Sequence, residues 1–284
     1  VERFAEVASG DVVILPAFGV SVPELAHLKS KQCVLVDTTC GSVLNVWKKV
    51  HYYARDRYTV IIHGKHHHEE TIATASQALT HDGGQYLCVR DVSETELVCD
   101  FIRGKISAAD LMSKFQEAAS PDFDPDVHLQ RIGLANQTTM LMSETLKVQE
   151  TLRRAMIERY GEAGLDARFR AFDTICSATQ ERQDAVLEML DAGGLDLMIV
   201  IGGYNSSNTL ALARMCAPRV TTFYVDSPQC VTDAGIKHHV IGTPGETLAP
   251  GWLPAGGVRL AMTAGASTDD IVGWVRANVA PRAD

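Results

Sequence analysis

Apolar runs of strand length alternate with helical patterns along nearly the whole chain. This alternation is typical of parallel sheets covered by helices, so we expect an α/β fold with more than one such unit. The predicted strands are 11–16, 33–39, 58–64, 85–90, 131–137, 168–175, 196–202, 220–225 and 257–263. The predicted helices lie near 22–31, 43–54, 69–79, 93–103, 107–119, 143–161, 179–192, 207–216 and 268–279.

The composition limits the kinds of partner and compartment. The chain has 284 residues, of which 46% are hydrophobic, so a substantial core is expected. Its net charge of −9 argues against nucleic acid or an anionic membrane as the main partner. The longest apolar run, at 195–203, has the length of a buried strand rather than a membrane span. The chain begins with Val just ahead of a predicted strand and without a signal peptide, so we expect a processed or truncated chain.

Two of the seven cysteines share one local context. Cys40 ends VDTTC and Cys176 ends FDTIC, each between a predicted strand and a predicted helix. The positive end of a helix dipole favours the thiolate, which binds iron–sulfur clusters and soft metals. A single cysteine is more often a core residue, but the repeated Asp-Thr-x-Cys favours ligands at both positions. The other cysteines, scattered and odd in number, are predicted core thiols of a reducing compartment: Cys33, Cys88, Cys99, Cys216 and Cys230.

The stretch HGKHHHEET at 63–71 follows a predicted strand and opens a predicted helix. Three consecutive histidines cannot all face one site and the HExxH spacing is absent, so a three-histidine metal site is not expected. His68 and Glu70 could bind a ligand and transfer a proton. Alternatively, Glu69 and Glu70 only stabilise the first helical turn through the dipole. The spacing alone does not separate these two interpretations.

Three strand ends are rich in hydroxyl groups. NSSN at 205–208 places hydroxyls, amides and backbone N–H groups at a helix N-terminus, which suits phosphate binding. TAGAS at 263–267 repeats this pattern, and NQTT at 136–139 is a third such end. Each stretch alone could be ordinary helix capping. Together they favour a small, strongly anionic ligand.

These motifs resemble a known family. DTTC, HGK-x-x-HEET-x-ATAS, ANQTTML, TIC-x-ATQERQDA, GG-x-NSSNT and TAGAS occur in the order found in 4-hydroxy-3-methylbut-2-enyl diphosphate reductases, between about Gly10 and Val279. The resemblance is to the plant and cyanobacterial branch. It implies three small α/β units in a pseudo-threefold arrangement around a central [4Fe–4S] cluster. Cys40 and Cys176 resemble the second and third cluster ligands, while the first lies upstream of this sequence and leaves the first unit incomplete.

The resemblance also implies where the units begin and end. Residues 1–40 would be the remainder of the first unit, and 257–284 would pack back on it as a strand and a helix. Residues 41–167 would form the second unit and 168–256 the third.

The activity implied by the resemblance is the last step of the non-mevalonate isoprenoid pathway. (E)-4-Hydroxy-3-methylbut-2-enyl diphosphate would be reduced to isopentenyl diphosphate and dimethylallyl diphosphate, with its hydroxyl on the open iron. Glu70 would deliver the proton through Thr138 and water, with His68 as the third catalytic residue. The implied substrate-binding residues are His68, Thr138, Ser206, Ser207, Asn208 and Ser267, of which His68, Ser206, Ser207, Asn208 and Ser267 would contact the diphosphate. The implied electron donor is ferredoxin, and the implied location is the plastid stroma, with a bacterial cytoplasm as the alternative.

Two departures from the family pattern leave other functions open. Phe18 stands where many bacterial members have histidine, and Gly41 stands where the family usually has proline. One alternative is a non-catalytic fragment or paralogue that binds an organic diphosphate without a cluster. The other is a zinc-type module that combines the histidines at 66–68 with Cys40 or Cys176.

Overall fold

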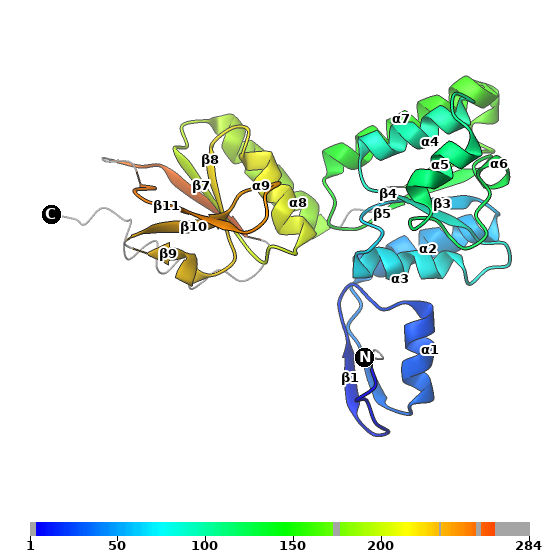
Figure 1. The fold of residues 1–284 in the computed structure, drawn as a ribbon, viewed down its shortest axis with the longest axis horizontal. Coiled ribbons are helices and arrows are strands. Elements are labelled where there is room, and N and C mark those ends of the chain that lie inside the picture. The colour runs from blue at the N-terminus through cyan, green and yellow to red at the C-terminus, as the bar shows by residue number, and fades with distance from the viewer. Residues whose placement is uncertain (1–3, 173–176, 233, 254–256, 265–284) are drawn as a thin grey trace. The chain divides into compact units, whose positions relative to one another are not determined.

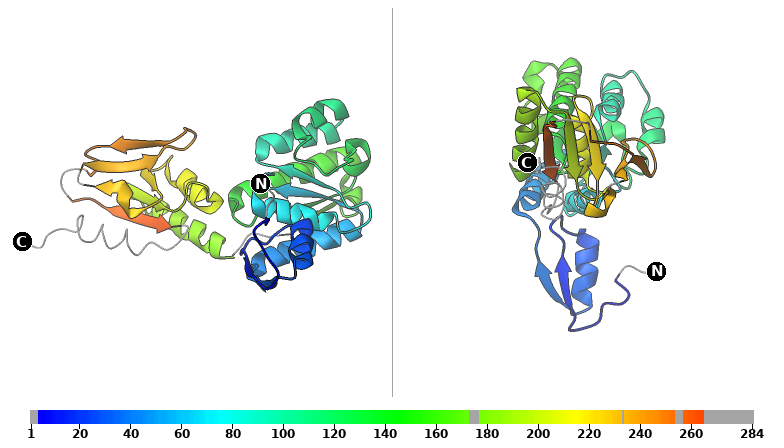
Figure 2. Two further views of the ribbon diagram at one scale, coloured as in Figure 1. Left: turned by 60° about the horizontal axis from the view of Figure 1, so that its bottom comes forward. Right: turned by 90° about the vertical axis from the view of Figure 1, so that its left-hand side faces the viewer.

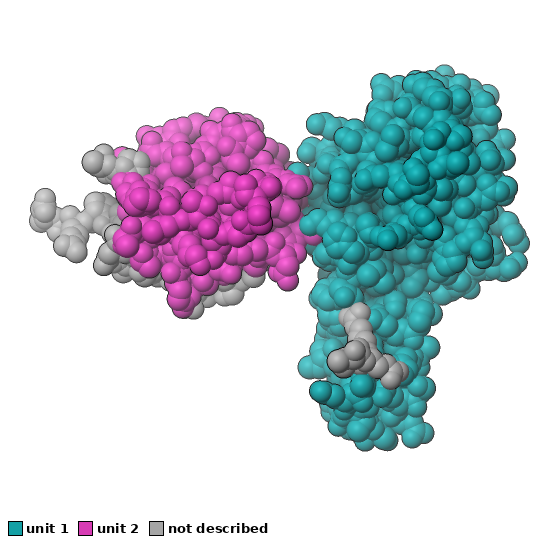
Figure 3. All heavy atoms as spheres, viewed as in Figure 1, with its two compact units in different colours: residues 1–176 teal, residues 177–284 magenta. Residues whose placement is uncertain are grey.

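The computed structural model describes residues 4–172, 177–232, 234–253 and 257–264. The chain divides into two compact units, residues 1–176 and 177–284 (Figure 3). The described residues form three separate sheets, each containing parallel strands, so the predicted α/β class is confirmed. No helix in these residues combines the length and the apolar character needed to cross a bilayer.

The first sheet is a parallel pair of strands joined by one helix, which packs against them (Figure 2). Ser21 starts the helix with a capping box, because its hydroxyl accepts from Glu24 N–H while the Glu24 carboxylate accepts from Ser21 N–H. Four aliphatic side chains of the strands are between 42 and 67% exposed: Val12, Ile14, Val34 and Val36. The elements are β1 (Val12–Leu15), α1 (Val22–Ser30) and β2 (Val34–Asp37).

The second sheet has the order β4-β3-β5-β6, and all its strands are parallel. Two helices, α2 and α3, cover one face, and α4 and α7 cover the other (Figure 1). Central strands that are buried on both faces read as continuous apolar runs, which explains why they were easy to predict. The strands are β3 (Thr59–His63), β4 (Tyr86–Val89), β5 (Ile132–Asn136) and β6 (Phe169–Ala171). The helices are α2 (Gly41–Arg55), α3 (Glu69–Ala78), α4 (Val92–Ile102), α5 (Ala108–Phe115), α6 (Pro125–His128), α7 (Met142–Tyr160) and the 3₁₀ turn η1 (Glu162–Gly164).

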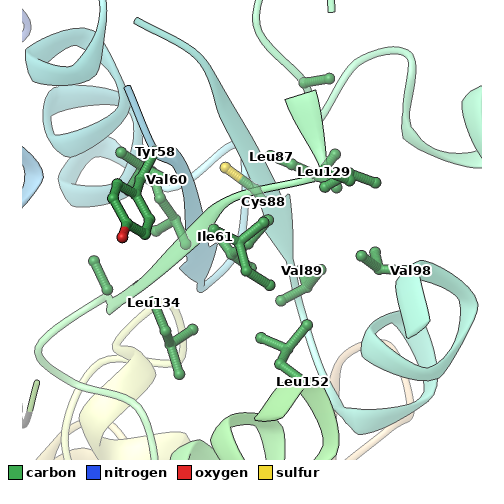
Figure 4. Packing of buried hydrophobic residues seen from close by; sticks show 14 of the residues in the cluster. Tyr58, Val60, Ile61, Leu87, Cys88, Val89, Val98, Leu129, Leu134 and Leu152 are labelled. Atoms are coloured by element: carbon green, nitrogen blue, oxygen red, sulfur yellow. The ribbon is translucent and has the colours of Figure 1, made fainter. Parts of the chain in front are cut away.

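The core of this sheet is closely packed around its central strands. Ile61 of β3 and Leu134 of β5 lie among buried residues that include Leu87 and Leu152 (Figure 4). Gly133 makes room for an aromatic ring, because a Cβ there would lie 2.5 Å from the ring of Tyr53. The Tyr53 hydroxyl donates to the Leu134 carbonyl at 3.0 Å, so this buried hydroxyl is satisfied.

The third sheet is mixed and forms the second compact unit. Met198 and Val200 of β7 pack with α8 and α9, while Ile199 belongs to a separate cluster with Trp252 on the other face. The strands β7 (Leu197–Ile201), β8 (Thr221–Val225) and β12 (Leu260–Ala264) are parallel. The antiparallel strands are β9 (Val231–Thr232), β10 (Gly235–His239) and β11 (Glu246–Ala249). The helices are α8 (Ser177–Ala192), α9 (Ser207–Cys216) and the 3₁₀ turn η2 (Pro228–Cys230).

Several elements differ from the sequence-based expectation. Strands β9 to β11 were not predicted. Lys237, His238 and His239 interrupt the apolar pattern of β10, β9 has only two residues, and β11 is mostly exposed. Strand β6 pairs with β5 of the second sheet, although 168–175 was assigned to the third unit. Strand β12 pairs with β7 of the third sheet, although 257–284 was expected on the first unit. The backbone N–H and C=O groups of an edge strand can pair with any strand that reaches them. A sequence pattern predicts that a strand forms, but it does not say which sheet the strand joins. The division into three units remains a prediction.

Candidate active site

His68 is the N-cap residue of α3, and this role fixes the state of its ring. The His68 Nδ1 atom accepts a hydrogen bond from the Glu70 backbone N–H at 3.2 Å. Because an amide N–H can only donate, Nδ1 carries no proton and the neutral ring holds its proton on Nε2. Burial and the nearby Lys65 ammonium lower the pKa of His68 below its ordinary value. The half-buried ring is therefore neutral near pH 7 and offers one N–H donor.

Glu70 lies in the first turn of α3 and is buried, with 3% of its surface exposed. Its Oε1 atom accepts a hydrogen bond from the Thr138 backbone N–H at 2.5 Å, and Thr138 is itself buried. Burial raises the pKa of Glu70, while the hydrogen bonds from Thr138 act in the opposite direction. The structure thus brings together two predicted catalytic residues that are 68 positions apart in the sequence.

Gln137 connects the segments that carry these residues, and the sequence interpretation did not assign it a role. Its Oε1 atom accepts from the Lys65 backbone N–H at 3.3 Å and from the Thr71 hydroxyl at 3.3 Å. Its Nε2 donates to the Thr139 hydroxyl at 2.9 Å. A Cβ on Gly64 would lie 2.9 Å from the Gln137 Cβ, so the loop backbone passes very close to this side chain. In the sequence, the only feature that pointed to a role for Gln137 was its place inside NQTT.

His63, at the end of β3, is a second residue that the sequence interpretation left without a role. It is fully buried, its Nδ1 lies 2.9 Å from the Thr145 hydroxyl, and its Nε2 has no hydrogen-bond partner among the described residues. Burial lowers the pKa of His63 to about 4. The ring is therefore neutral in the folded protein.

The free energy of unfolding is expected to fall as the pH is lowered from 6.5 to about 4, with His63 as one cause. The unfolded histidine binds a proton below its ordinary pKa of about 6.5, whereas folded His63 binds one only near pH 4, so protons favour the unfolded state in this window. The contribution is at most about 3 kcal/mol. Urea unfolding at several pH values should show a shallower pH dependence for His63→Gln than for the wild type. Identical slopes for the two proteins would contradict this assignment.

Cys40 is the N-cap residue of α2, in the predicted position between a strand and a helix. Its thiol is exposed and makes no capping hydrogen bond. Its backbone N–H donates to the Ala17 carbonyl at 2.8 Å, which ties the start of α2 to the loop after β1. An exposed thiol at a helix N-terminus fits an iron–sulfur ligand in position and in donor chemistry.

The other described cysteines are poor candidates for cluster ligands. Burial raises the pKa of Cys88 and Cys99 to about 12 and that of Cys216 to about 11, which keeps these thiols protonated. Cys230 is buried, and Cys33 is half-buried with its thiol 3.2 Å from the Leu28 carbonyl. Two predicted site residues, Cys176 and Ser267, lie outside the described residues.

The NSSN stretch occupies the N-terminus of α9 in the second compact unit. Ser206 is an ordinary cap, because its hydroxyl accepts from Thr209 N–H at 3.3 Å. Ser207 and Asn208 are buried, and their Oγ and Oδ1 atoms have no hydrogen-bond partner among the described residues. Buried polar atoms without partners are uncommon, so a ligand that bonds to them is a physical explanation. The capping alternative therefore accounts for Ser206 and leaves Ser207 and Asn208 unexplained.

The second unit also brings together three side chains of types that can ligate metals, a grouping that the sequence did not reveal. Ligand atoms of Asp226, Cys230 and Glu246 lie within 4.8 Å of one another. The Glu246 carboxylate already pairs with the Lys237 ammonium and accepts a hydrogen bond from the Tyr204 hydroxyl at 2.8 Å. Because Lys237 already supplies a positive charge beside Glu246, this group carries no metal assignment.

Sequence comparison assigns the family. The sequence pattern of the LytB protein family matches residues 1–278. The chain belongs to the LytB family. The LytB family consists of iron–sulfur oxidoreductases.

Two curated relatives, from Synechococcus sp. (strain CC9311) and Thermosynechococcus vestitus (strain NIES-2133 / IAM M-273 / BP-1), are both 4-hydroxy-3-methylbut-2-enyl diphosphate reductases. They are 47% identical over 274 residues and 45% identical over 273 residues, and each match covers 96% of this chain. The matches cover 67% and 66% of the relatives, so the LytB chain described here spans about two thirds of their length.

Solved structures show the same fold. A solved (E)-4-hydroxy-3-methyl-but-2-enyl diphosphate reductase, the terminal enzyme of the non-mevalonate pathway, has a TM-score of 0.53 and covers 97% of this chain and 78% of its own. The corresponding reductase from Plasmodium falciparum has a TM-score of 0.67 and covers 99% of this chain and 71% of its own. Both are 21% identical to this chain. The predicted family, its α/β fold and its reductase function are therefore confirmed at the level of the LytB family.

Proposed function

We propose that this chain carries part of the active site for reductive dehydroxylation of (E)-4-hydroxy-3-methylbut-2-enyl diphosphate. The observation that supports this most directly is the buried Glu70 carboxyl, which accepts the Thr138 backbone N–H and lies two residues after the oriented N–H donor of His68. The overall reaction adds two electrons and two protons, breaks the C–O bond and releases water. The products are isopentenyl diphosphate and dimethylallyl diphosphate.

A [4Fe–4S] cluster, when bound, would supply the electrons one at a time and an open iron for the substrate oxygen. Cys40 is the described residue that fits one ligand position, and the repeated sequence context assigns a second to Cys176. The resemblance to the plant and cyanobacterial branch supports a ferredoxin as the one-electron donor and a plastid or bacterial location. The three observed sheets would then be the cores of the three units of the family fold.

Glu70 would supply the proton that turns the substrate hydroxyl into a water leaving group. Its buried position favours the protonated carboxyl, and a neighbouring diphosphate would favour it further. The Thr138 backbone N–H holds one oxygen of the Glu70 carboxyl, and the Thr138 hydroxyl also bonds to this carboxyl, which suits Thr138 to take part in the proton transfer. His68 would bind the diphosphate through its Nε2–H.

By the family resemblance, Ser206, Ser207, Asn208 and Ser267 would also bind the diphosphate. The unpartnered Oγ of Ser207 can donate to a phosphate oxygen, and the helix N-terminus adds backbone N–H groups and a positive dipole end. The Asn208 amide can also donate to a phosphate oxygen. The oxygen and nitrogen of an amide are told apart only by their hydrogen-bond partners, so the unpartnered atom can equally be the N–H₂ group.

Ser207→Ala and Asn208→Ala are expected to weaken substrate binding by about 10- to 100-fold each, since a hydrogen bond to a charged group is lost. The measurement is the dissociation constant of the substrate, with the cluster absorption spectrum as a check on the rest of the site. Ser113→Ala, on the exposed surface of α5, is the matched control. Unchanged affinity in both variants would mean that this stretch only begins a helix.

The proposed function is tested by anaerobic reconstitution with iron and sulfide, followed by dithionite-driven reduction of the substrate, on a protein that has the full length of the reductase relatives. We expect iron and sulfide in the protein and conversion to the two isomeric products. Binding of the diphosphate without iron would instead support a non-catalytic binding protein, and stoichiometric zinc would support the zinc-type module.

A further inference from the structure

The loop at residues 16–19 connects the predicted cluster ligand with the predicted diphosphate ligand. It begins directly after β1 and contains a tight turn, in which Gly19 N–H donates to the Pro16 carbonyl at 2.8 Å. On one side, the Ala17 carbonyl accepts the backbone N–H of Cys40. On the other side, the ring of Phe18 lies against the ring of His68, with 6.4 Å between their centroids and an interplanar angle of 67°.

The loop is held firmly by the helices beneath it. The Trp47 ring of α2 packs so closely on Gly19 that a Cβ at this glycine would lie 2.5 Å from it. Gly19 also has φ of +77°, a conformation that side chains other than glycine rarely adopt. The Trp47 Nε1–H donates to the Thr74 hydroxyl of α3 at 3.2 Å. Phe18 is therefore presented from a fixed backbone rather than from a loose loop.

We propose that Phe18 is a positioning residue for His68, and that its ring sets the direction in which the His68 Nε2–H donates to a phosphate oxygen. The proposal rests on the assignment of His68 as a diphosphate ligand under the proposed function. Phe18 offers no hydrogen bond of its own, so its effect on the ligand passes through the imidazole.

The physical reason is that the cap alone leaves the ring loosely defined. The bond from Glu70 N–H to His68 Nδ1 fixes one ring atom at 3.2 Å, but it does not prevent the plane from tilting around that contact. An edge-to-face contact with a second ring favours one tilt. Phe18 also shields one side of the imidazole from water, which adds to the burial that lowers the pKa of His68. The charged and titratable groups acting on this ring are those of Lys65, His67 and Glu69.

The test uses two variants that remove the aromatic ring and one that keeps it. Phe18→Leu and Phe18→Met are expected to weaken the binding of inorganic diphosphate by about 2- to 10-fold, measured by calorimetry at pH 7.5. Phe18→Tyr should bind like the wild type, because it retains the ring. In the nitrogen-detected NMR titration of the histidines, the pKa of His68 should rise toward its ordinary value in Phe18→Leu and Phe18→Met only. Tyr52→Leu, which removes an exposed ring on α2, is the control.

A fourth variant separates failure of this inference from failure of the proposed function. If His68→Ala binds inorganic diphosphate as tightly as the wild type, the role of His68 in the proposed function is wrong, and the role of Phe18 with it. If His68→Ala binds more weakly while Phe18→Leu and Phe18→Met change neither the affinity nor the His68 pKa, only the positioning role is overturned. A loss of affinity in Phe18→Tyr equal to that in Phe18→Leu would also overturn it.

Discussion

Replacing Glu70 with glutamine is expected to lower kcat by about 10²- to 10⁴-fold, the range that a general acid typically contributes. Glutamine is nearly isosteric and its side-chain oxygen can still accept the Thr138 backbone N–H, so the local fold should be retained. It cannot release a proton to the departing hydroxyl. The KM should change much less than kcat, because the amide keeps the polar contacts of the site. The measurement is steady-state reduction of the substrate by the reconstituted protein, with product quantification.

The control is Glu69→Gln, on the preceding residue of the same turn. Glu69 is half-exposed, whereas Glu70 is buried, and successive helical residues point about 100° apart. We expect Glu69→Gln to remain within a few-fold of the wild type. If Glu69→Gln were inactive and Glu70→Gln active, the general acid would be Glu69 instead of Glu70. Full activity in both variants would place the proton donor elsewhere.

Replacing Cys40 with serine is expected to abolish stable cluster binding and, with it, substrate reduction. The serine hydroxyl is far less readily deprotonated than a thiol and is a poor ligand for iron in a sulfide cluster. The measurements are the iron and sulfide content after anaerobic reconstitution and the visible absorption of the cluster. Since Cys40 is exposed and its thiol makes no capping bond, the substitution should leave the free energy of unfolding of the metal-free protein nearly unchanged.

Cys33→Ser is the matched control, because Cys33 is only seven positions away and its half-buried thiol contacts a backbone carbonyl. It should reconstitute like the wild type. Normal iron content in Cys40→Ser, or loss of iron in Cys33→Ser alone, would mean that the repeated Asp-Thr-x-Cys does not mark ligands.

Much of the fold followed from local patterns. The buried strands β3, β5 and β7 are short, mostly apolar runs, and their existence could be predicted because burial on both faces favours apolar side chains. The sequence also predicted the helices that follow the strands, and the structure shows that Ser21 caps the start of one of them, α1. Strands β9 to β11 were missed, because a partly exposed antiparallel segment needs no regular apolar pattern.

Some features of the candidate site could likewise be predicted from the sequence, and others required the structure. By itself, the sequence determined the position of each polar strand end, the helix that follows Cys40, His68 and Ser206, and the family to which the ordered motifs belong. These features depend on residue type and on neighbours within a few positions, so they can be read locally.

Only the tertiary structure decided which of these residues act on one another. It joined the Thr138 backbone to the Glu70 carboxyl, the Gln137 side chain to the Lys65 backbone, and the Phe18 ring to the His68 ring. The two residues of each pair are tens of positions apart in the sequence. It also shifted the protonation of buried groups, since burial is the main cause that raises the pKa of Glu70 and lowers the pKa of His63. Burial and long-range contact are properties of the packed chain, and a pattern of neighbouring residues does not contain them.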